Sequence, residues 1–248
     1  MTALPTHLEA TAILNGRFQC VQPRFGFRFS VDALLLAWFA LRSGSNTPFC
    51  ELGAGSGIIS ALLVRGGLPG GLAVELDPVM IECLTRTVAE NGLESRVSIC
   101  PHDLRALRNV LGAGSFRMVV ANPPYFPLGE GRVDADAADA RARHEFTCTM
   151  ADLLSATRYL LPNRGRLSLI YPAARLVECL GALPAHKLLP TRLQLVHPRA
   201  DRRASHFLLE AAKSEGPDLV VESPLVVHDN GTAGYGAWYA ELLGQIED

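Results

Sequence analysis

The 248-residue sequence lacks the features of a membrane or exported protein. No apolar run reaches the roughly 18–20 residues that a membrane helix needs, because the longest candidate, residues 31–41, is short and contains Asp32. That stretch also lies far from the start and has neither a basic segment before it nor a cleavage pattern after it. We therefore expect a cytoplasmic protein that has no membrane partner.

The sequence also lacks paired cysteines and has little lysine. Its six cysteines are scattered without a Cys-x-x-Cys pair, so we expect reduced, mostly buried thiols and no bound metal. Only Lys187 and Lys213 are lysines, and the net charge is −2. This balance argues against a chain coated in positive charge, but a local arginine patch remains compatible with a nucleic-acid partner.

Hydrophobic residues make up 48% of the chain, which is enough for a large core, and they fall into alternating short runs. The first 45 residues predict an extension: a strand over 12–23 with a turn at Asn15-Gly16, a second short strand over 24–29, and a helix over 33–42. Residues 46–248 predict the main domain. Its expected strands are 49–52, 72–76, 97–100, 116–121, 166–171, 188–197 and 205–212, and its expected helices are 58–65, 78–91, 150–161 and 173–183. This alternation predicts an α/β fold in which helices cover both faces of a seven-stranded, mostly parallel sheet.

A glycine-rich stretch, Glu51-Leu52-Gly53-Ala54-Gly55-Ser56-Gly57, closes the first of these strands and opens a helix. A phosphate-binding P-loop would need Lys-Ser/Thr after the last glycine, and a dinucleotide fingerprint would need glycine where Ile58 stands. The remaining pattern, acid-x-Gly-x-Gly-x-Gly, resembles the first motif of Rossmann-like class I methyltransferases. That resemblance implies that S-adenosyl-L-methionine contacts Glu51, Leu52, Gly53, Ala54, Gly55 and Gly57.

Two acids follow at the ends of the next two expected strands. Glu75 lies 24 residues after Glu51, where a carboxylate can accept hydrogen bonds from two ribose hydroxyls, and Leu76 follows it. Asp103, followed by Leu104, ends the third strand. The resemblance implies that Asp103 contacts the adenine amine, although a helix N-cap would use the same residue. Asp77, beside Glu75, precedes Pro78 and predicts a helix start.

The most specific motif is Asn122-Pro123-Pro124-Tyr125, directly after the fourth strand. A planar amine attached to a ring or carbonyl is a poor nucleophile because its lone pair is delocalised. Two acceptors, the Asn122 side-chain oxygen and the Pro123 carbonyl, can hold its hydrogens and orient that lone pair toward a sulfonium methyl group. The prolines stiffen the loop, and Tyr125 offers a face for stacking. We expect these four residues to form the catalytic site, and Asn122 to contact the cofactor as well.

A wider resemblance narrows the acceptor. The stretch Phe27-Arg28-Phe29-Ser30-Val31-Asp32-Ala33-Leu34-Leu35-Leu36, Phe126 after the signature, and Ala142-Arg143-His144-Glu145 resemble the bacterial tRNA1(Val) adenine-N6 methyltransferase family. The resemblance spans about Ile13 to Lys213. It implies methylation of the 6-amino group of an anticodon-loop adenosine in tRNA, with S-adenosyl-L-homocysteine as the product.

Further residues carry over from that resemblance. Asp32 and Ala33 match a segment that closes over the cofactor, although Asp32 also suits a helix cap. Residues 129–143 resemble a loop beside the site, either solvated or ordered by RNA. An RNA path would be lined by six basic residues: Arg141, Arg143, Lys187, Arg199, Arg202 and Arg203.

Three alternatives remain open. Glutamine-amide methyltransferases that act on proteins such as release factors usually bring a helical amino-terminal domain, and only about 45 residues precede this sheet. DNA methyltransferases usually carry a target-recognition domain, for which there is little room, and rRNA enzymes share the signature. A cofactor-binding protein without catalysis would have no need for Asn-Pro-Pro-Tyr. The sequence leaves the oligomeric state, monomer or dimer, undecided.

Overall fold

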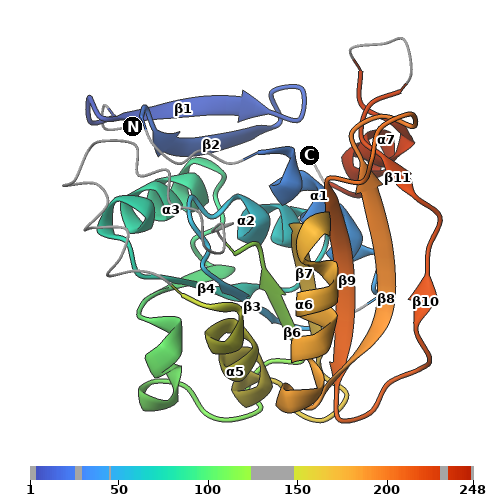
Figure 1. The fold of residues 1–248 in the computed structure, drawn as a ribbon. Helices are drawn as coiled ribbons and strands as arrows, with labels where there is room; N and C mark the ends of the chain where they lie inside the picture. Colours follow the sequence, from blue (N-terminus) through green and yellow to red (C-terminus); the bar gives the residue numbers. More distant parts are fainter. Residues whose placement is uncertain (1–3, 26–29, 45, 124–147, 230–233, 247–248) are drawn as a thin grey trace, which may run out of the picture.

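The computed structural model describes residues 4–25, 30–44, 46–123, 148–229 and 234–246 (Figure 1). The strands are β1 Leu8–Ile13, β2 Phe18–Pro23, β3 Phe49–Leu52, β4 Gly71–Glu75, β5 Val97–Pro101, β6 Met118–Ala121, β7 Arg166–Pro172, β8 Leu188–His197, β9 His206–Lys213, β10 Val220–Val221 and β11 Leu225–Val226. The α-helices are α1 Val31–Leu41, α2 Ile58–Arg65, α3 Pro78–Glu90, α5 Met150–Leu160, α6 Leu176–Ala182 and α7 Ala237–Gln245. Short 3-10 helices are η1 Leu104–Asn109, η2 Ala173–Arg175 and η3 Pro184–His186.

The central sheet confirms the expected seven strands, in the order β8-β9-β7-β6-β3-β4-β5. Strands β3 to β7 pair in parallel, whereas β9 runs antiparallel to both β7 and β8. The two-residue strands β10 and β11 add to β8 in parallel, and the sequence did not predict them. The sheet is therefore mostly parallel. Its one reversed strand, β9, runs from the edge where the parallel strands end back to the edge where they begin.

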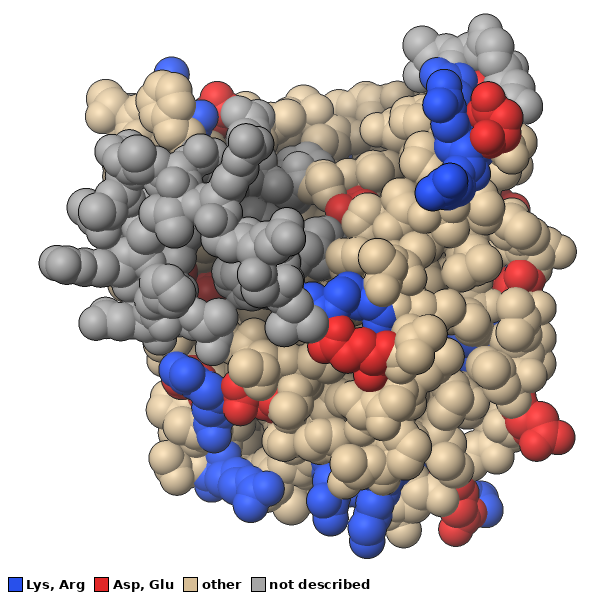
Figure 2. All heavy atoms as spheres, viewed as in Figure 1, with Lys and Arg blue, Asp and Glu red and all other residues tan. Residues whose placement is uncertain are grey.

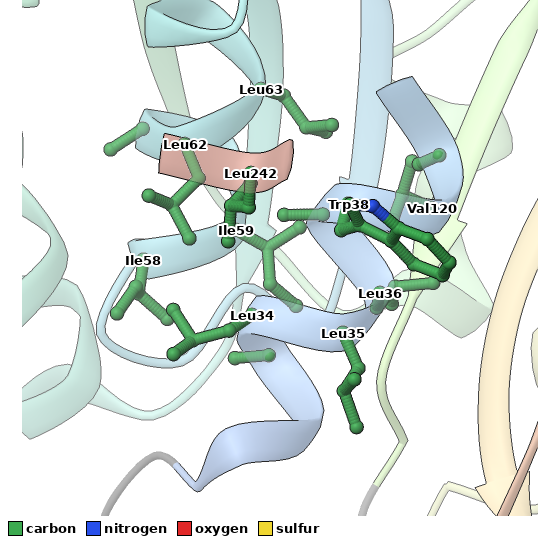
Figure 3. Close-up of a cluster of buried hydrophobic side chains, with 14 of the residues drawn as sticks. Leu34, Leu35, Leu36, Trp38, Ile58, Ile59, Leu62, Leu63, Val120 and Leu242 are labelled. Atoms are coloured by element: carbon green, nitrogen blue, oxygen red, sulfur yellow. The ribbon is translucent and has the colours of Figure 1, made fainter. Parts of the chain in front are cut away.

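Hydrophobic cores form on both faces of the sheet because successive strand residues point to opposite sides. Along β6, Met118 and Val120 join the core under α1, α2 and α7, while Val119 and Ala121 join the core under α5 and α6. Figure 3 shows the first core, where side chains of α1 and α2 meet Leu242 of α7. Burial on both faces explains why the strands are apolar throughout and do not alternate with polar residues.

The amino-terminal hairpin packs on α3, and Figure 1 shows it lying over that helix. Its turn follows the expected Asn15-Gly16, with left-handed φ angles of +57° and +84°. Asn91 holds the outer edge of β2 by accepting from the Gln19 N–H at 3.1 Å and donating to the Gln19 carbonyl at 2.7 Å. Thr87 accepts from the Val21 N–H in the same way. An edge strand thus has backbone groups satisfied by helix side chains.

The chain after the hairpin departs from the expected second strand. Arg24 and Phe25 form a bend, so a strand beginning at residue 24 is wrong, and residues 26–29 lie outside the described part of the chain. Arg24 instead donates to the carbonyl of Leu8 at 3.1 Å. The alternation of basic and aromatic residues there resembles a strand pattern. The backbone N–H of Arg24 does donate to the carbonyl of His7, just before β1, but Arg24 and Phe25 are not part of a strand.

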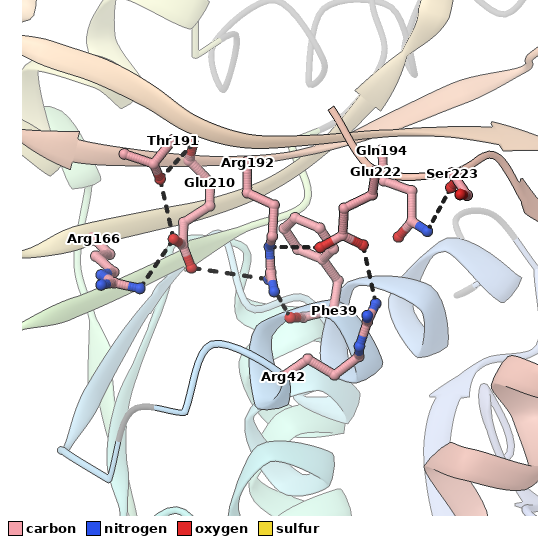
Figure 4. A network of polar contacts seen from close by, with 9 residues as sticks. All are labelled: Phe39, Arg42, Arg166, Thr191, Arg192, Gln194, Glu210, Glu222 and Ser223. Atoms are coloured by element: carbon pink, nitrogen blue, oxygen red, sulfur yellow. Dashed lines mark hydrogen bonds and ion pairs between the residues drawn. The ribbon is translucent and has the colours of Figure 1, made fainter. Parts of the chain in front are cut away.

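Helix α1 is almost entirely buried between the sheet and the other helices. Its carboxyl end is fixed by Arg192 of β8, which donates to the Phe39 carbonyl at 2.7 Å and lies over the Phe39 ring. Figure 4 shows this guanidinium between Glu210 and Glu222, at 3.9 and 3.6 Å. The amino-terminal residues therefore belong to the packing of the main sheet.

The strand order reverses at β3, whose neighbours are β4 on one side and β6 on the other. In open α/β sheets ligands bind where the order reverses, at the carboxyl ends of the strands. The glycine-rich turn follows β3 and Asn122 follows β6, so both occupy that position.

Candidate functional site

The turn after β3 forms an open cradle. Its three glycines, Gly53, Gly55 and Gly57, have φ angles of +73°, +54° and +78°, which side chains rarely adopt. A Cβ on Gly53 or Gly55 would meet no atom within 4 Å, whereas one on Gly57 would lie 2.2 Å from the side chain of Leu84. The first two glycines therefore border open space for a ligand, and the third allows α2 to pack closely on α3.

Glu75, at the end of β4, braces this turn. Its carboxylate accepts hydrogen bonds from the backbone N–H groups of Gly55 and Leu76, both at 2.7 Å, and of Asp77 at 2.9 Å. Each carboxylate oxygen has two lone pairs, so the oxygen that faces Gly55 retains room for another donor. The structure thus brings the first predicted acid beside the glycine turn.

Glu51 has a different environment from that of Glu75. It lies on the same face of β3 as Phe49, is buried, and accepts from the backbone N–H of Ser60 at 2.8 Å and from the Ser60 hydroxyl. Burial raises the pKa of Glu51 to about 8. Its carboxyl group therefore joins β3 to the first turn of α2 and supports the glycine turn from beneath. Ser60 was not predicted from the sequence, because a serine nine residues after the acid matches no motif.

Asp103 caps η1 by accepting from the Arg105 N–H at 2.8 Å, and the Arg105 guanidinium binds both of its carboxylate oxygens. The hydrogen bond from Arg105 holds the pKa of Asp103 below its usual range. The cap considered for this residue is confirmed. The carboxylate remains partly accessible, with 27% of the side chain exposed, so it is able to accept from a further group. Leu104 follows it at the start of η1.

Asn122 and Pro123 leave the end of β6, whose four residues are all buried. Leu52 and Ala121 are paired in register, so Gly53 and Asn122 begin their turns side by side, on strands about 5 Å apart. The two motifs that are 65 residues or more apart in sequence therefore meet at one edge. Pro124 and Tyr125 lie outside the described residues, as do Arg141, Arg143 and the segment 129–143.

Asp32 lies near this edge at the start of α1, followed by the buried Ala33. Its carboxylate accepts from the Ser30 hydroxyl at 2.6 Å, and Ser30 is the helix N-cap. The ring of His206, the first residue of β9, lies 3.9 Å away through Nδ1. His206 was not predicted from the sequence, because it lies more than 170 residues after Asp32 and is brought to it by the antiparallel course of β9.

The predicted RNA contacts separate into two places. Arg199, Arg202 and Arg203 occupy the turn after β8, at the edge that holds Asn122. Figure 2 shows basic side chains gathered over that turn at the upper right, with acids beside them. Lys187 precedes β8 and therefore lies about 30 Å from that turn, at the opposite edge of the sheet. The structure does not bring Lys187 to the site.

Within the described residues, no group of three or more His, Cys, Asp or Glu side chains is arranged to hold a metal ion. None of the described helices combines the length and the apolar character required to cross a membrane. Four of the six cysteines, Cys20, Cys50, Cys83 and Cys179, are buried, as expected.

Comparisons with known proteins place this fold and site in context. No family model matches the chain. The chain is 28% identical over 236 residues to the tRNA1(Val) (adenine(37)-N6)-methyltransferase of Porphyromonas gingivalis, with 91% of each chain covered. It is 30% identical over 166 residues to the Shewanella loihica protein of the same name, covering 66% of this chain and 67% of that one.

Among solved structures, a predicted O-methyltransferase from Agrobacterium tumefaciens has a TM-score of 0.69 and 21% identity, over 86% of this chain and 96% of its own. At that identity the likeness establishes the fold, which is the Rossmann-like methyltransferase fold expected from the glycine motif. Together with the curated relatives, it shows that the chain belongs to the tRNA1(Val) (adenine(37)-N6)-methyltransferase family.

Proposed function

We propose that the chain transfers a methyl group from S-adenosylmethionine to the exocyclic 6-amino group of an adenosine in tRNA, the anticodon-loop adenosine of tRNA Val. The observation that carries the proposal is the meeting of Asn122-Pro123 with the glycine turn at the point where the strand order reverses. The names of the curated relatives supply the choice of tRNA and of the nitrogen.

The polar groups around the glycine turn fit S-adenosylmethionine. Ribose hydroxyls and the adenine amine are hydrogen-bond donors, and Glu75 and Asp103 present carboxylate acceptors at the ends of neighbouring strands. Gly53 and Gly55 border open space in which the ligand backbone can approach closely. In this arrangement Glu75 and Leu76 hold the ribose, Asp103 and Leu104 hold the adenine, and Asp32 closes the other side. When bound, S-adenosylmethionine supplies the electrophilic methyl group.

Asn122 and Pro123 orient the acceptor. The side-chain oxygen of Asn122 and the carbonyl of Pro123 accept the two hydrogens of the planar amine, which directs its lone pair toward the methyl group. The buried strand β6 fixes the start of this loop, so little reorganisation accompanies binding. Tyr125 supplies the stacking face, and the methylated nitrogen releases its proton to solvent. Arg199, Arg202 and Arg203 contribute phosphate contacts, in a protein that we place in the cytoplasm.

Methyl transfer from radiolabelled S-adenosylmethionine tests the proposal. We expect label in total tRNA, and none in release factor or DNA, with N6-methyladenosine as the labelled nucleoside. Asn122→Ala should reduce transfer by at least about 100-fold, since the orientation of the amine is lost while the binding of S-adenosylhomocysteine persists. Asn109→Ala, on the exposed face of η1, is the matched control. Label in glutamine or in another nucleoside would overturn the assignment, and an active Asn122→Ala enzyme would overturn the mechanism.

A further inference from the structure

The turn between β8 and β9 rises at the same edge as the catalytic motif. Ala121 of β6 pairs with Leu169 of β7, and Pro172, three residues later, pairs with His206 of β9. The turn that precedes His206 therefore stands beyond the ends of the parallel strands. It carries Arg199, Arg202 and Arg203 within five residues.

Arg202 and Arg203 differ from many other arginines of the chain, because their contacts with carboxylates are weak or absent within the described residues. Arg202 lies 3.9 Å from Asp201, and both side chains are about 70% exposed. Arg203 is exposed and makes no ion pair or hydrogen bond within the described residues. By contrast, Arg105 and Arg166 bind carboxylates at 2.5 and 3.1 Å. Exposed guanidinium groups held apart from carboxylates are suited to phosphate.

An aromatic pair lies beside this turn. The rings of His228 and Tyr235 stack at 5.1 Å with an angle of 19° between their planes, across an antiparallel bridge. Tyr235 is 39% exposed, and it is backed by Trp238 and Tyr239 at 5.4 and 4.7 Å. Trp238 is itself fixed by donating to the Val227 carbonyl. The rings therefore keep their orientation without a ligand, which reduces the entropy that binding must overcome.

Backbone contacts join the two parts into one surface. The N–H groups of Val227 and His228 donate to the carbonyls of His197 and Pro198, at 2.8 and 3.1 Å. Arg199 donates to the Asp229 carbonyl at 3.2 Å. Figure 1 shows the turn beside α7, and Figure 2 shows the basic side chains exposed there. We call the surface made by Arg199, Arg202, Arg203, His228 and Tyr235 the arginine–tyrosine surface.

The spacing of strands sets how far this surface lies from the target base. Three strand-to-strand steps separate β6 from β8, and β11 adds one more. At about 4.8 Å per step, the lateral distance from Asn122 to this surface is roughly 15–20 Å. At a rise of roughly 3.4 Å per stacked nucleotide, this reach corresponds to about five nucleotides. The surface therefore meets RNA that flanks the modified nucleotide.

We propose that the arginine–tyrosine surface is a second RNA contact, in which the arginines bind phosphates of the flanking strand and Tyr235 stacks on an unpaired base. The inference rests on the proposed function, because it takes the same tRNA as the ligand. Phosphate binding depends on salt and stacking largely does not, so the two halves of the surface have separable signatures.

Fluorescence anisotropy of labelled tRNA over a series of salt concentrations tests the proposal. Arg202→Gln/Arg203→Gln should weaken binding and reduce the slope of log Kd against log salt by about 1–2. Tyr235→Leu, which keeps apolar bulk against Trp238, should raise Kd about 5- to 100-fold with little change in that slope. Arg164→Gln/Lys187→Gln, at the opposite edge, removes the same charge and should leave both quantities unchanged.

Steady-state kinetics completes the test. The surface lies away from Asn122, so its variants should raise KM for tRNA and leave kcat within about twofold, because the contact is made equally in the ground and transition states. Binding and salt slopes equal to those of the Arg164/Lys187 control would overturn the inference while wild-type methylation of tRNA continues. Absence of wild-type methylation of tRNA would instead be a failure of the proposed function.

Discussion

The carboxylate of Glu75 accepts a 2.7 Å hydrogen bond from the backbone N–H of Gly55, so the end of β4 directly holds the turn that follows β3. One residue therefore has two tasks: it shapes the glycine turn, and it presents an acceptor to the ligand beside that turn. A carboxylate that already accepts three backbone N–H groups is fixed in position before any ligand arrives.

Replacing Glu75 should separate these tasks. Glu75→Ala removes a charged acceptor and should raise the Kd for S-adenosylhomocysteine by about 10- to 100-fold. Glu75→Gln keeps one acceptor oxygen and should lose less affinity. Isothermal titration calorimetry gives both values, and equal affinity of the Ala variant and wild type would show that Glu75 does not hold the ligand.

The glycines of the turn should respond differently to alanine. Gly55→Ala places a Cβ in open space, so it should weaken cofactor binding and cost only the strain of a left-handed residue, about 1–2 kcal/mol. Gly57→Ala drives a Cβ to within 2.2 Å of Leu84, which adds overpacking of about 1–3 kcal/mol. Urea denaturation should therefore show Gly57→Ala to be less stable than Gly55→Ala. Cofactor binding should show the opposite order, with Gly55→Ala binding the cofactor more weakly than Gly57→Ala. The same ranking in both assays would contradict this division.

Glu51 should make stability depend on pH. Its pKa is raised by burial from 4.5 to about 8, so the folded chain keeps a proton that the unfolded chain has already lost in that window. The unfolded state binds fewer protons there, and the contribution to stability is complete below pH 4.5 and is lost as pH rises to about 8. Each kcal/mol lost lowers Tm by about 2–4 °C in a chain of this size.

Thermal melts at pH 6 and pH 9 measure this dependence. Wild type should lose more Tm over that interval than Glu51→Gln, because the amide cannot ionise but its oxygen still accepts from Ser60. Parallel curves for the two proteins would show that Glu51 does not titrate in this range.

The pair Arg192–Glu210 should be important to stability. Burial lowers the pKa of Arg192, and Glu210 is almost inaccessible to solvent. Arg192→Ala leaves Glu210 with fewer partners and Phe39 without its donor, at a cost of about 3 kcal/mol in unfolding free energy. Arg192→Ala/Glu210→Gln should recover part of that cost. Urea denaturation of the single and double variants tests the coupling, and additive losses would rule it out.

The sequence predicted the central part of the fold closely because its signals are local. Pro78, the Asn91-Gly92 pair and the glycine turn mark element ends, and the apolar runs between them match β3 to β6. The two-residue strands β10 and β11 were missed because they are short and are ordered by pairing with β8. Helix α7 was missed as well, and it packs on α1, which lies far away in sequence. The direction of β9 depends on long-range pairing, which no local pattern specifies.

For the site, acids and glycines at strand ends were predictable because parallel strands end at one edge. The contacts that those acids make could not be predicted from the sequence. Ser60 on Glu51 and Arg105 on Asp103 depend on side-chain directions. Lys187 appeared close to Arg199 in sequence, but an extended strand of ten residues separates them.

The burial of α1 has a consequence for how the chain is synthesised. This apolar helix leaves the ribosome well before Arg192 and Glu241, which bind Phe39 and Trp38 and lie 153 and 203 residues further along. Until those residues are synthesised, the nascent chain exposes an apolar helix whose contacts with them cannot yet form. Dependence on such distant contacts slows folding. We therefore expect expression of soluble protein to depend on chaperone supply and growth temperature more than the modest size of the chain suggests.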